Sequence, residues 1–166
     1  PRWAAQTLAV RGKLYVVGGG NVAQTTAAAT EVYDPMNPTQ GWTTLSDTHG
    51  LWWAGGATSM GNIYVIGGDV FPCTVCDGDS YAYVSVFSDE SKWNYVAPMD
   101  VSRSAAPGCA ALGGKLYVVG GAILNWDTPG GIVYDPIDNS WNAIAPMDVS
   151  RGTLGLAALG GKLYAV

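Results

Sequence analysis

The feature that most constrains the fold is a short phrase that recurs at nearly even spacing: a tyrosine, two small apolar residues and two glycines. Three copies close on glycine pairs and a fourth is cut short at the end of the chain: Gly18 and Gly19, Gly67 and Gly68, Gly120 and Gly121, then Leu163 to Val166. The first glycines of the pairs stand 49 and 53 residues apart (18 to 67, 67 to 120). A period near fifty residues predicts a repeat architecture in which each repeat is one supersecondary unit.

Other residues follow the same period. Each glycine pair is followed by an aromatic residue in an apolar run and then by a tryptophan: Tyr33 and Trp42, Phe87 and Trp93, Tyr134 and Trp141. A segment Ala-Pro-Met-Asp-Val-Ser-Arg occurs twice and ends at Arg103 and Arg151. The second repeat has Phe87 and Ser88 where the others have Tyr-Asp. These landmarks divide the chain into repeats at about 1–50, 51–103 and 104–151, with a partial repeat at 152–166.

The runs between these landmarks are short, rich in Val, Ile, Tyr and Ala, and bounded by turn-forming residues, which is typical of strands. No segment shows a sustained helical period. In the third repeat the pattern predicts four strands, at about 108–112, 115–120, 131–134 and 141–143. Two-residue hairpin turns are expected at Arg11-Gly12, Gly61-Asn62, Gly113-Gly114 and Gly160-Gly161. The chain is therefore predicted to be all-β, with three four-stranded antiparallel blades and part of a fourth.

These landmarks resemble the kelch repeat, which forms one blade of a β-propeller. The resemblance rests on the glycine pairs, the two tyrosines, the three tryptophans and the two arginines, and it covers essentially the whole chain. It implies a segment of a single kelch-type propeller. Propellers close with four to eight blades, so we expect the segment to be part of a larger propeller or to complete one by self-association. A glycine at the end of a strand indicates close packing against a neighbouring sheet.

The repeat also predicts the environment of its landmark residues. The three tryptophans are expected to be buried between blades, and Arg103 and Arg151 to occupy equivalent turns with hydrogen bonds to carbonyls or a carboxylate. The terminal faces of the stack are expected to be apolar. One would be the blade holding Leu14, Tyr15 and Val17, and the other would be formed by Leu154, Leu156, Leu159 and Leu163.

The composition narrows the class of partner. The formal net charge is −5 with 8 Lys and Arg, and charged residues make up 13% of the chain. Without a basic stripe, nucleic acid is not an expected partner, and no apolar run is long enough to span a membrane. So little charge is compatible with contact with copies of the same protein or with a carbohydrate coat. The preferred interpretation is that a secreted β-rich protein carries Ser and Thr on its outer faces.

A Cys-x-x-C pair, Cys73 and Cys76, lies in an insertion loop of the second repeat. Such a pair serves as half of a zinc site, a redox centre or a loop disulfide. A zinc site needs two more ligands, for which only His49 and Cys109 are at hand, and no helix follows to lower a thiol pKa. We therefore expect a disulfide, and with it an oxidising, extracellular location. Cys109 is expected to be a free, buried, apolar residue.

Two further polar features carry weaker signals. Asp69, Asp77 and Asp79 surround the same loop, but their spacing does not match a twelve-residue calcium loop, so a solvated turn is the preferred interpretation. His49 is the only histidine. It is expected to take the place of the arginine of the other repeats, in a turn between two blades. We predict no catalytic residue, no cofactor and no metal in this segment.

Trp52, Trp53 and Trp126 lie outside the repeat frame. Trp52 and Trp53 are adjacent, so in a strand one would enter the core and the other would face outward. Trp126 is expected in a loop. Exposed tryptophans anchor sugars or protein partners, so these three are the candidate contact surface. The alternative is that they cover the apolar rim of a blade.

Together these features favour a non-enzymatic structural or interaction module, extracellular and built of kelch blades. Its expected partners are further blades or copies of the same protein, in an assembly that could be fibrous. Carbohydrate is a second expected partner. Two alternatives stay open. One is a fragment of a secreted carbohydrate oxidase like galactose oxidase, with its copper ligands outside this segment. The other is an intracellular kelch adaptor for ubiquitin ligation, which would require an upstream helical domain and reduced cysteines.

Overall fold

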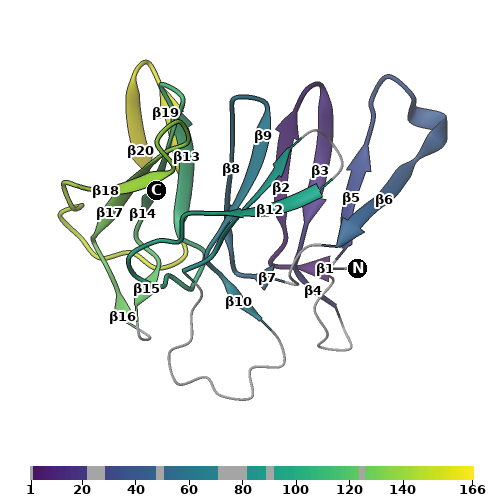
Figure 1. Cartoon of the computed structure of the whole chain (residues 1–166). Coiled ribbons are helices and arrows are strands. Elements are labelled where there is room, and N and C mark those ends of the chain that lie inside the picture. The colour runs from purple at the N-terminus through teal and green to yellow at the C-terminus, as the bar shows by residue number, and fades with distance from the viewer. Residues whose placement is uncertain (1, 22–28, 48–50, 71–81, 89–91, 124–125) are drawn as a thin grey trace.

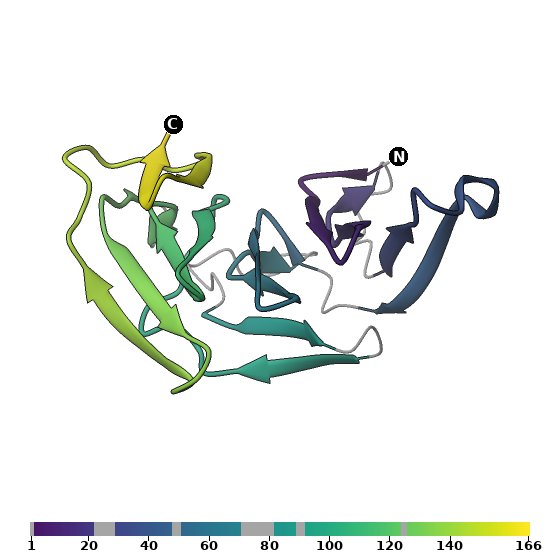
Figure 2. The same ribbon diagram turned by 90° about the horizontal axis from the view of Figure 1, so that it is seen from above.

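A computed structural model describes residues 2–21, 29–47, 51–70, 82–88, 92–123 and 126–166. Within these ranges the chain is built of β-strands and one turn of 3-10 helix, η1 (Pro38–Gln40). Three four-stranded antiparallel sheets and a C-terminal hairpin stand side by side (Figure 1), and they follow an arc when seen from above (Figure 2). The predicted all-β architecture of consecutive blades is confirmed.

Each sheet is formed by strands that follow one another along the chain. The first sheet contains β2 (Gln6–Val10), β3 (Lys13–Val17), β5 (Ala29–Tyr33) and β6 (Trp42–Asp47). The second contains β8 (Gly55–Ser59), β9 (Asn62–Ile66), β11 (Val84–Ser88) and β12 (Lys92–Val96). The third contains β13 (Gly108–Leu112), β14 (Lys115–Val119), β17 (Gly131–Asp135) and β18 (Ser140–Ile144). The C-terminal hairpin is β19 (Leu156–Leu159) with β20 (Lys162–Ala165).

Short strand pairs close the base of the sheets, at the lower edge of Figure 1. They are β1 (Arg2–Trp3) with β4 (Gly20–Asn21), β7 (Leu51–Trp52) with β10 (Asp69–Val70), and β15 (Ala122–Ile123) with β16 (Trp126–Asp127). Below the third sheet a single bridge joins Ser104 to Ala122. The β1–β4 pair, the β7–β10 pair and the Ser104–Ala122 bridge each join the residues just before the first strand of a sheet to those just after its second strand, so they mark equivalent positions in successive repeats. The β15–β16 pair is a separate hairpin that follows the second strand of the third sheet.

The hairpin turns between first and second strands have positive φ at both residues, which matches the right-handed twist of the strands they join. The values are 51° and 76° at Arg11 and Gly12, 60° and 80° at Gly113 and Gly114, and 57° and 75° at Gly160 and Gly161. In the second sheet the turn is Met60 and Gly61, at 51° and 75°, not Gly61 and Asn62 as predicted. Asn62 already pairs with Ser59 in the ladder.

The apolar core lies between the sheets. One cluster joins the first sheet to the second: Tyr15, Val17, Leu51, Ala54, Ile63, Val65 and Phe87. The other joins the second to the third: Ala57, Tyr64, Ile66, Val84, Val86, Met99, Leu116, Val118, Ile132 and Tyr134. Each blade thus buries its apolar face against a neighbour, as expected of a repeat array.

This arrangement corrects the predicted terminal faces. Tyr15 and Val17 face the second sheet and are buried, so only Leu14 of the three predicted residues lies exposed on the outer face of the first sheet. At the other end Leu159 is exposed. Leu163 is half-buried, because its position matches Leu116 and so faces the preceding sheet.

Candidate functional site

The junction between the second and third sheets is organised around one arginine. The Arg103 side chain is 3% exposed, and its Nη1 donates to the carbonyl oxygens of Gly120 (2.7 Å) and Gly130 (3.2 Å), which lie at the ends of two strands of the third sheet. Its own backbone carbonyl accepts a hydrogen bond from the Gly68 N–H of the second sheet (3.1 Å). Burial lowers the pKa of the guanidinium, with Asp100 opposing the shift. Arg103 therefore ties two blades together, and we call its place in the repeat the arginine position.

The same side-chain contacts recur at Arg2, a residue that the sequence analysis does not single out. Arg2 donates from Nη1 to the carbonyl oxygens of Gly18 (3.1 Å) and Ala29 (2.9 Å), which are the counterparts of Gly120 and Gly130. It also forms an ion pair with Glu31. A signal was present, since Arg2 precedes Gly18 by 16 residues and Arg103 precedes Gly120 by 17.

The other two arginine positions differ. In the second repeat the position is occupied by Leu51, because its carbonyl accepts the Gly19 N–H (2.9 Å). The prediction that His49 takes this place is therefore wrong in register, and His49 itself lies outside the described residues. Arg151 keeps the backbone bond, from the Gly121 N–H (3.0 Å), but its side chain is exposed.

The glycine pairs are where the sheets approach most closely. All six glycines have positive φ, between 64° and 93°. A Cβ on Gly18 would overlap the Leu51 carbonyl oxygen, and one on Gly120 would lie 2.5 Å from the Arg151 carbonyl oxygen. A side chain at these places would thus be strained in its backbone and would separate neighbouring blades.

Each blade carries one aromatic pair across its third and fourth strands. The ring centroids are 5.4 Å apart for Tyr33 and Trp42, 5.2 Å for Phe87 and Trp93, and 5.0 Å for Tyr134 and Trp141. Two of these pairs extend to the preceding sheet, where Tyr15 lies 6.1 Å from Phe87 and Tyr64 lies 6.1 Å from Tyr134. Edge-to-face and tilted contacts at this range add to the area that the rings bury.

The tryptophans connect blades by hydrogen bonds as well as by packing. The Trp93 indole donates to Thr30 Oγ1 of the first sheet (3.3 Å), and the Trp141 indole donates to the Ala97 carbonyl oxygen after the second sheet (2.8 Å). Both rings are half-buried. The expectation that Trp42 is equally buried is wrong, because it is 50% exposed. No sheet in the described chain precedes the one that carries it.

Asn139 completes the junction at the third sheet. Its side-chain oxygen accepts hydrogen bonds from the Tyr134 hydroxyl (2.7 Å) and from the Ala97 N–H (2.8 Å). Burial raises the pKa of Tyr134 to about 12. These groups are paired within the fold, so they hold the blades rather than a substrate.

The predicted contact tryptophans separate into two places. Trp52 and Trp53 lie at the base, where both are joined by Trp3, whose ring is 4.7 Å from Trp52 and 6.2 Å from Trp53. Trp126 lies apart from them in β16 and is exposed. The structure therefore groups two of the three predicted residues and adds Trp3, which sequence neighbourhood alone could not connect to them.

The remaining polar candidates are scattered. Cys109 is a free thiol whose pKa is raised to about 12 by burial, although the residue as a whole is only half-buried. Asp69 is half-buried in β10, and burial raises its pKa. Cys73, Cys76, Asp77 and Asp79 lie outside the described residues, so their predicted roles remain predictions. In the described ranges no three His, Cys, Asp or Glu side chains gather as a metal site would require.

A shallow hollow of about 200 Å³ lies on the first sheet between its strands and η1. Its walls are Lys13, Tyr15, Val32, Asp34, Gln40, Gly41, Thr43 and Leu45. The Asp34 carboxylate is held by the Met36 N–H and the Asn37 amide, which lower its pKa. This carboxylate is therefore held within its own turn.

The comparisons agree with the architecture. Residues 103–148 match the family described as Kelch motif, a range that runs from the buried arginine to the last strand of the third sheet. No curated protein matches the chain. In the described part of the chain there is no helix of the length and apolarity that crossing a membrane requires.

Proposed function

This chain is a kelch-repeat protein, and on that premise we propose that it is a non-enzymatic interaction module whose two open sheet faces bind further blades of the same kind. The observation that carries the proposal is a contrast at one repeat position. Leu14 is 37% exposed on the first sheet, whereas its counterparts Ile63 and Leu116 are 1% and 0% exposed. The residue types are alike, so the difference lies in whether a blade covers them.

The opposite end offers the complementary half of such a contact. Tyr164 occupies the position of Tyr15 and Tyr64, each of which packs on an aromatic ring of the next sheet, but Tyr164 is 49% exposed. A copy that docks its C-terminal hairpin on the outer face of the first sheet would bring Tyr164 toward Tyr33. Such docking would continue the order of blades from one copy to the next. It is a head-to-tail, heterologous contact, which leads to a ring or an open fibre.

The surface area and the charge are compatible with this role. The accessible surface of 8579 Å² exceeds the value of about 7,800 Å² expected for a compact monomer of this mass. The low content of charged residues leaves little like-charge repulsion between copies. Rigid blades then act by shape, presenting loops and faces to a partner.

Sedimentation of the 166-residue chain tests the proposal. We expect concentration-dependent association at micromolar concentration, which Leu14→Glu and Tyr164→Glu should abolish because each places a charge in the contact. Ile137→Glu, at an exposed turn of the third sheet, which carries neither Leu14 nor Tyr164, is the matched control and should associate like the parent chain. A well-folded monomer at these concentrations would refute the proposal.

Secretion is part of the same proposal and depends on Cys73 and Cys76. A disulfide between them would fit an oxidising compartment. Alkylation of protein from its native source, followed by mass spectrometry, distinguishes the disulfide from two reduced thiols. Two alkylated thiols would remove the argument for an extracellular location.

A further inference from the structure

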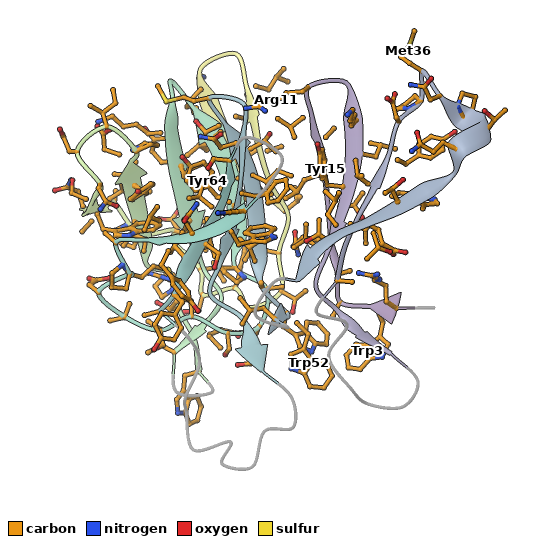
Figure 3. All side chains as sticks on the ribbon, turned by 45° about the vertical axis from the view of Figure 1, so that its right-hand side comes forward. Trp3, Arg11, Tyr15, Met36, Trp52 and Tyr64 are labelled. Atoms are coloured by element: carbon orange, nitrogen blue, oxygen red, sulfur yellow. The ribbon has the colours of Figure 1, made fainter. Side chains whose placement is uncertain are left out.

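Trp3, Trp52 and Trp53 form what we call the tryptophan cluster, at the base of the first two sheets. The Trp3 ring lies against Trp52 at 4.7 Å with planes inclined by 51°, and it meets Trp53 nearly edge-on at 6.2 Å. Figure 3 shows the Trp3 and Trp52 side chains next to each other below the strands. Trp3 is 43% exposed and Trp53 is 38% exposed, so two of the three rings reach solvent.

The fold does not require tryptophan at these places. By register with the base strands, the third repeat has Ser104 and Ala105 where the second has Trp52 and Trp53. Trp53 has a φ of 55°, and its counterparts Ala4 and Ala105 have 53° and 54°. The left-handed conformation disfavours a bulky residue, and strain of this kind gathers at functional sites. Two repeats use alanine here, so the large ring in the second serves something other than the turn.

A carboxylate borders the cluster. Asp69 in β10 pairs directly with Trp52 in β7, so the two side chains lie on the same face of the strand pair. Asp69 is half-buried, and its carboxylate forms no hydrogen bond or ion pair with any residue that the structure describes. It is therefore a hydrogen-bond acceptor held beside an aromatic surface.

The size and the packing of the cluster decide among possible ligands. The exposed parts of Trp3 and Trp53 amount to about 200 Å², taking about 250 Å² for a whole tryptophan. A stable protein partner needs about 800 Å² on each side, which is far more. Because the Trp3 and Trp52 ring centroids lie only 4.7 Å apart, these two rings leave no space between them for an ammonium group.

We propose that the tryptophan cluster binds a neutral pyranose ring of an oligosaccharide or polysaccharide. The exposed indole of Trp53 stacks on the C–H face of the sugar, and the Trp3 indole, which is nearly edge-on to Trp53, borders the sugar ring. The Asp69 carboxylate accepts hydrogen bonds from the hydroxyl groups of the sugar. Both contacts are of the kind that small polar ligands use, an apolar surface with a few placed polar groups. The proposal is independent of assembly, because the cluster lies at the base of the blades and not on either open face.

Isothermal titration calorimetry with four β-1,4-linked hexasaccharides, of glucose, galactose, mannose and N-acetylglucosamine, tests the site. We expect at least one to bind with a Kd of about 1 mM or tighter. Trp53→Ala and Trp3→Ala should weaken that binding about tenfold or more, and Asp69→Asn should weaken it less. Trp53→Ala removes the strained side chain, so its fold should be retained, which urea unfolding checks.

Trp126→Ala is the matched control, because Trp126 is also exposed but lies in β16 of the third repeat. It should bind the same hexasaccharide as tightly as the parent chain. The proposal is overturned if none of the four hexasaccharides binds at about 10 mM, or if Trp126→Ala weakens binding as much as Trp53→Ala. It is also overturned if tetramethylammonium competes for the cluster with higher affinity than the sugar, or if Trp53→Ala alters self-association and leaves sugar binding intact.

Discussion

The outer face of the first sheet and the matching faces of the second and third sheets carry the same kinds of residue in different surroundings. An aliphatic residue, an aromatic residue and a tryptophan lie across each: Leu14, Tyr33 and Trp42 on the first, Ile63, Phe87 and Trp93 on the second, and Leu116, Tyr134 and Trp141 on the third. On the first sheet all three side chains are partly exposed. On the second and third sheets the aliphatic residue and the Phe or Tyr are buried. Burial in this fold is thus a property of the junction and not of the blade.

The largest difference is expected at the aliphatic position. Leu116→Ala should lower the free energy of unfolding by about 2–5 kcal/mol, because it empties a site enclosed by two sheets. Leu14→Ala should cost less than about 1 kcal/mol at low protein concentration, because water already reaches that side chain. Urea unfolding followed by circular dichroism measures both.

Protein concentration sharpens this comparison. If copies cover the first sheet, the cost of Leu14→Ala should grow as the concentration is raised, since association stabilises only the folded chain. The cost of Leu116→Ala should not change. Equal losses for both variants at every concentration would contradict the idea that the neighbouring blade, rather than the position, sets the energy.

The arginine positions provide the next comparison. Arg103→Ala should cost about 1.5–3 kcal/mol, because it removes a charged donor from two carbonyl groups in a buried junction. Arg151→Ala should lie within about 0.5 kcal/mol of the parent chain, because its side chain is exposed. Arg103→Lys should recover little, since an ammonium lacks the fork of the guanidinium. If Arg103→Ala leaves the free energy of unfolding unchanged, the backbone hydrogen bond alone joins the blades.

The indole hydrogen bonds predict a smaller effect. Trp141→Phe loses the bond to the Ala97 carbonyl oxygen and should cost about 1 kcal/mol more than Trp42→Phe, for which the described chain provides no preceding blade. Thermal unfolding of the two variants provides the measurement. If Trp42→Phe lowers the stability as much as Trp141→Phe, another blade must cover the first sheet in solution.

Most of the local structure could be predicted from the sequence, because each blade satisfies its own strand pairing. The predicted ranges 108–112, 115–120, 131–134 and 141–143 each fall within one residue of the strand ends of the third sheet. Positive-φ hairpin glycines and the alternation of side chains along the strands determine this register without help from other repeats.

What depends on neighbours could not be predicted in the same way. The exposure of Trp42 and Arg151 follows from which blades are beside them, and a repeat pattern treats every copy alike. The repeat pattern does not align Arg2 with Arg103, because the spacing from the arginine to the glycine pair differs by one residue. The tryptophan cluster joins Trp3 to Trp52 across two repeats, a proximity that only the stacking of blades creates.

The smallest expected effects compare the two aspartates that begin the turn after the third strand. Asp34 accepts a hydrogen bond from the Met36 N–H (2.9 Å), and Asp135 accepts one from the Ile137 N–H (3.0 Å) and pairs with Lys115 (2.9 Å). The Met36 and Asn37 bonds lower the pKa of Asp34, and the bond to Lys115, followed by that to Ile137, lowers the pKa of Asp135. A lowered pKa in the fold means that the contribution to stability is present above the unfolded value of 3.8 and is lost as the pH falls through the folded value.

Salt should change the pKa of Asp135 more than that of Asp34, because only Asp135 has a charged group as its main partner. Lys115 is exposed, so about 1 M salt should screen it, and the pKa of Asp135, measured by carboxyl carbon NMR, should rise toward 3.8. The pKa of Asp34 should change less, since its main partners are a backbone N–H and a neutral amide. Asp135→Asn should remove the part of the acid-induced loss of stability that salt alters. An equal response of both carboxylates to salt would show that the net charge of the chain, rather than the Lys115 contact, sets the pKa of Asp135.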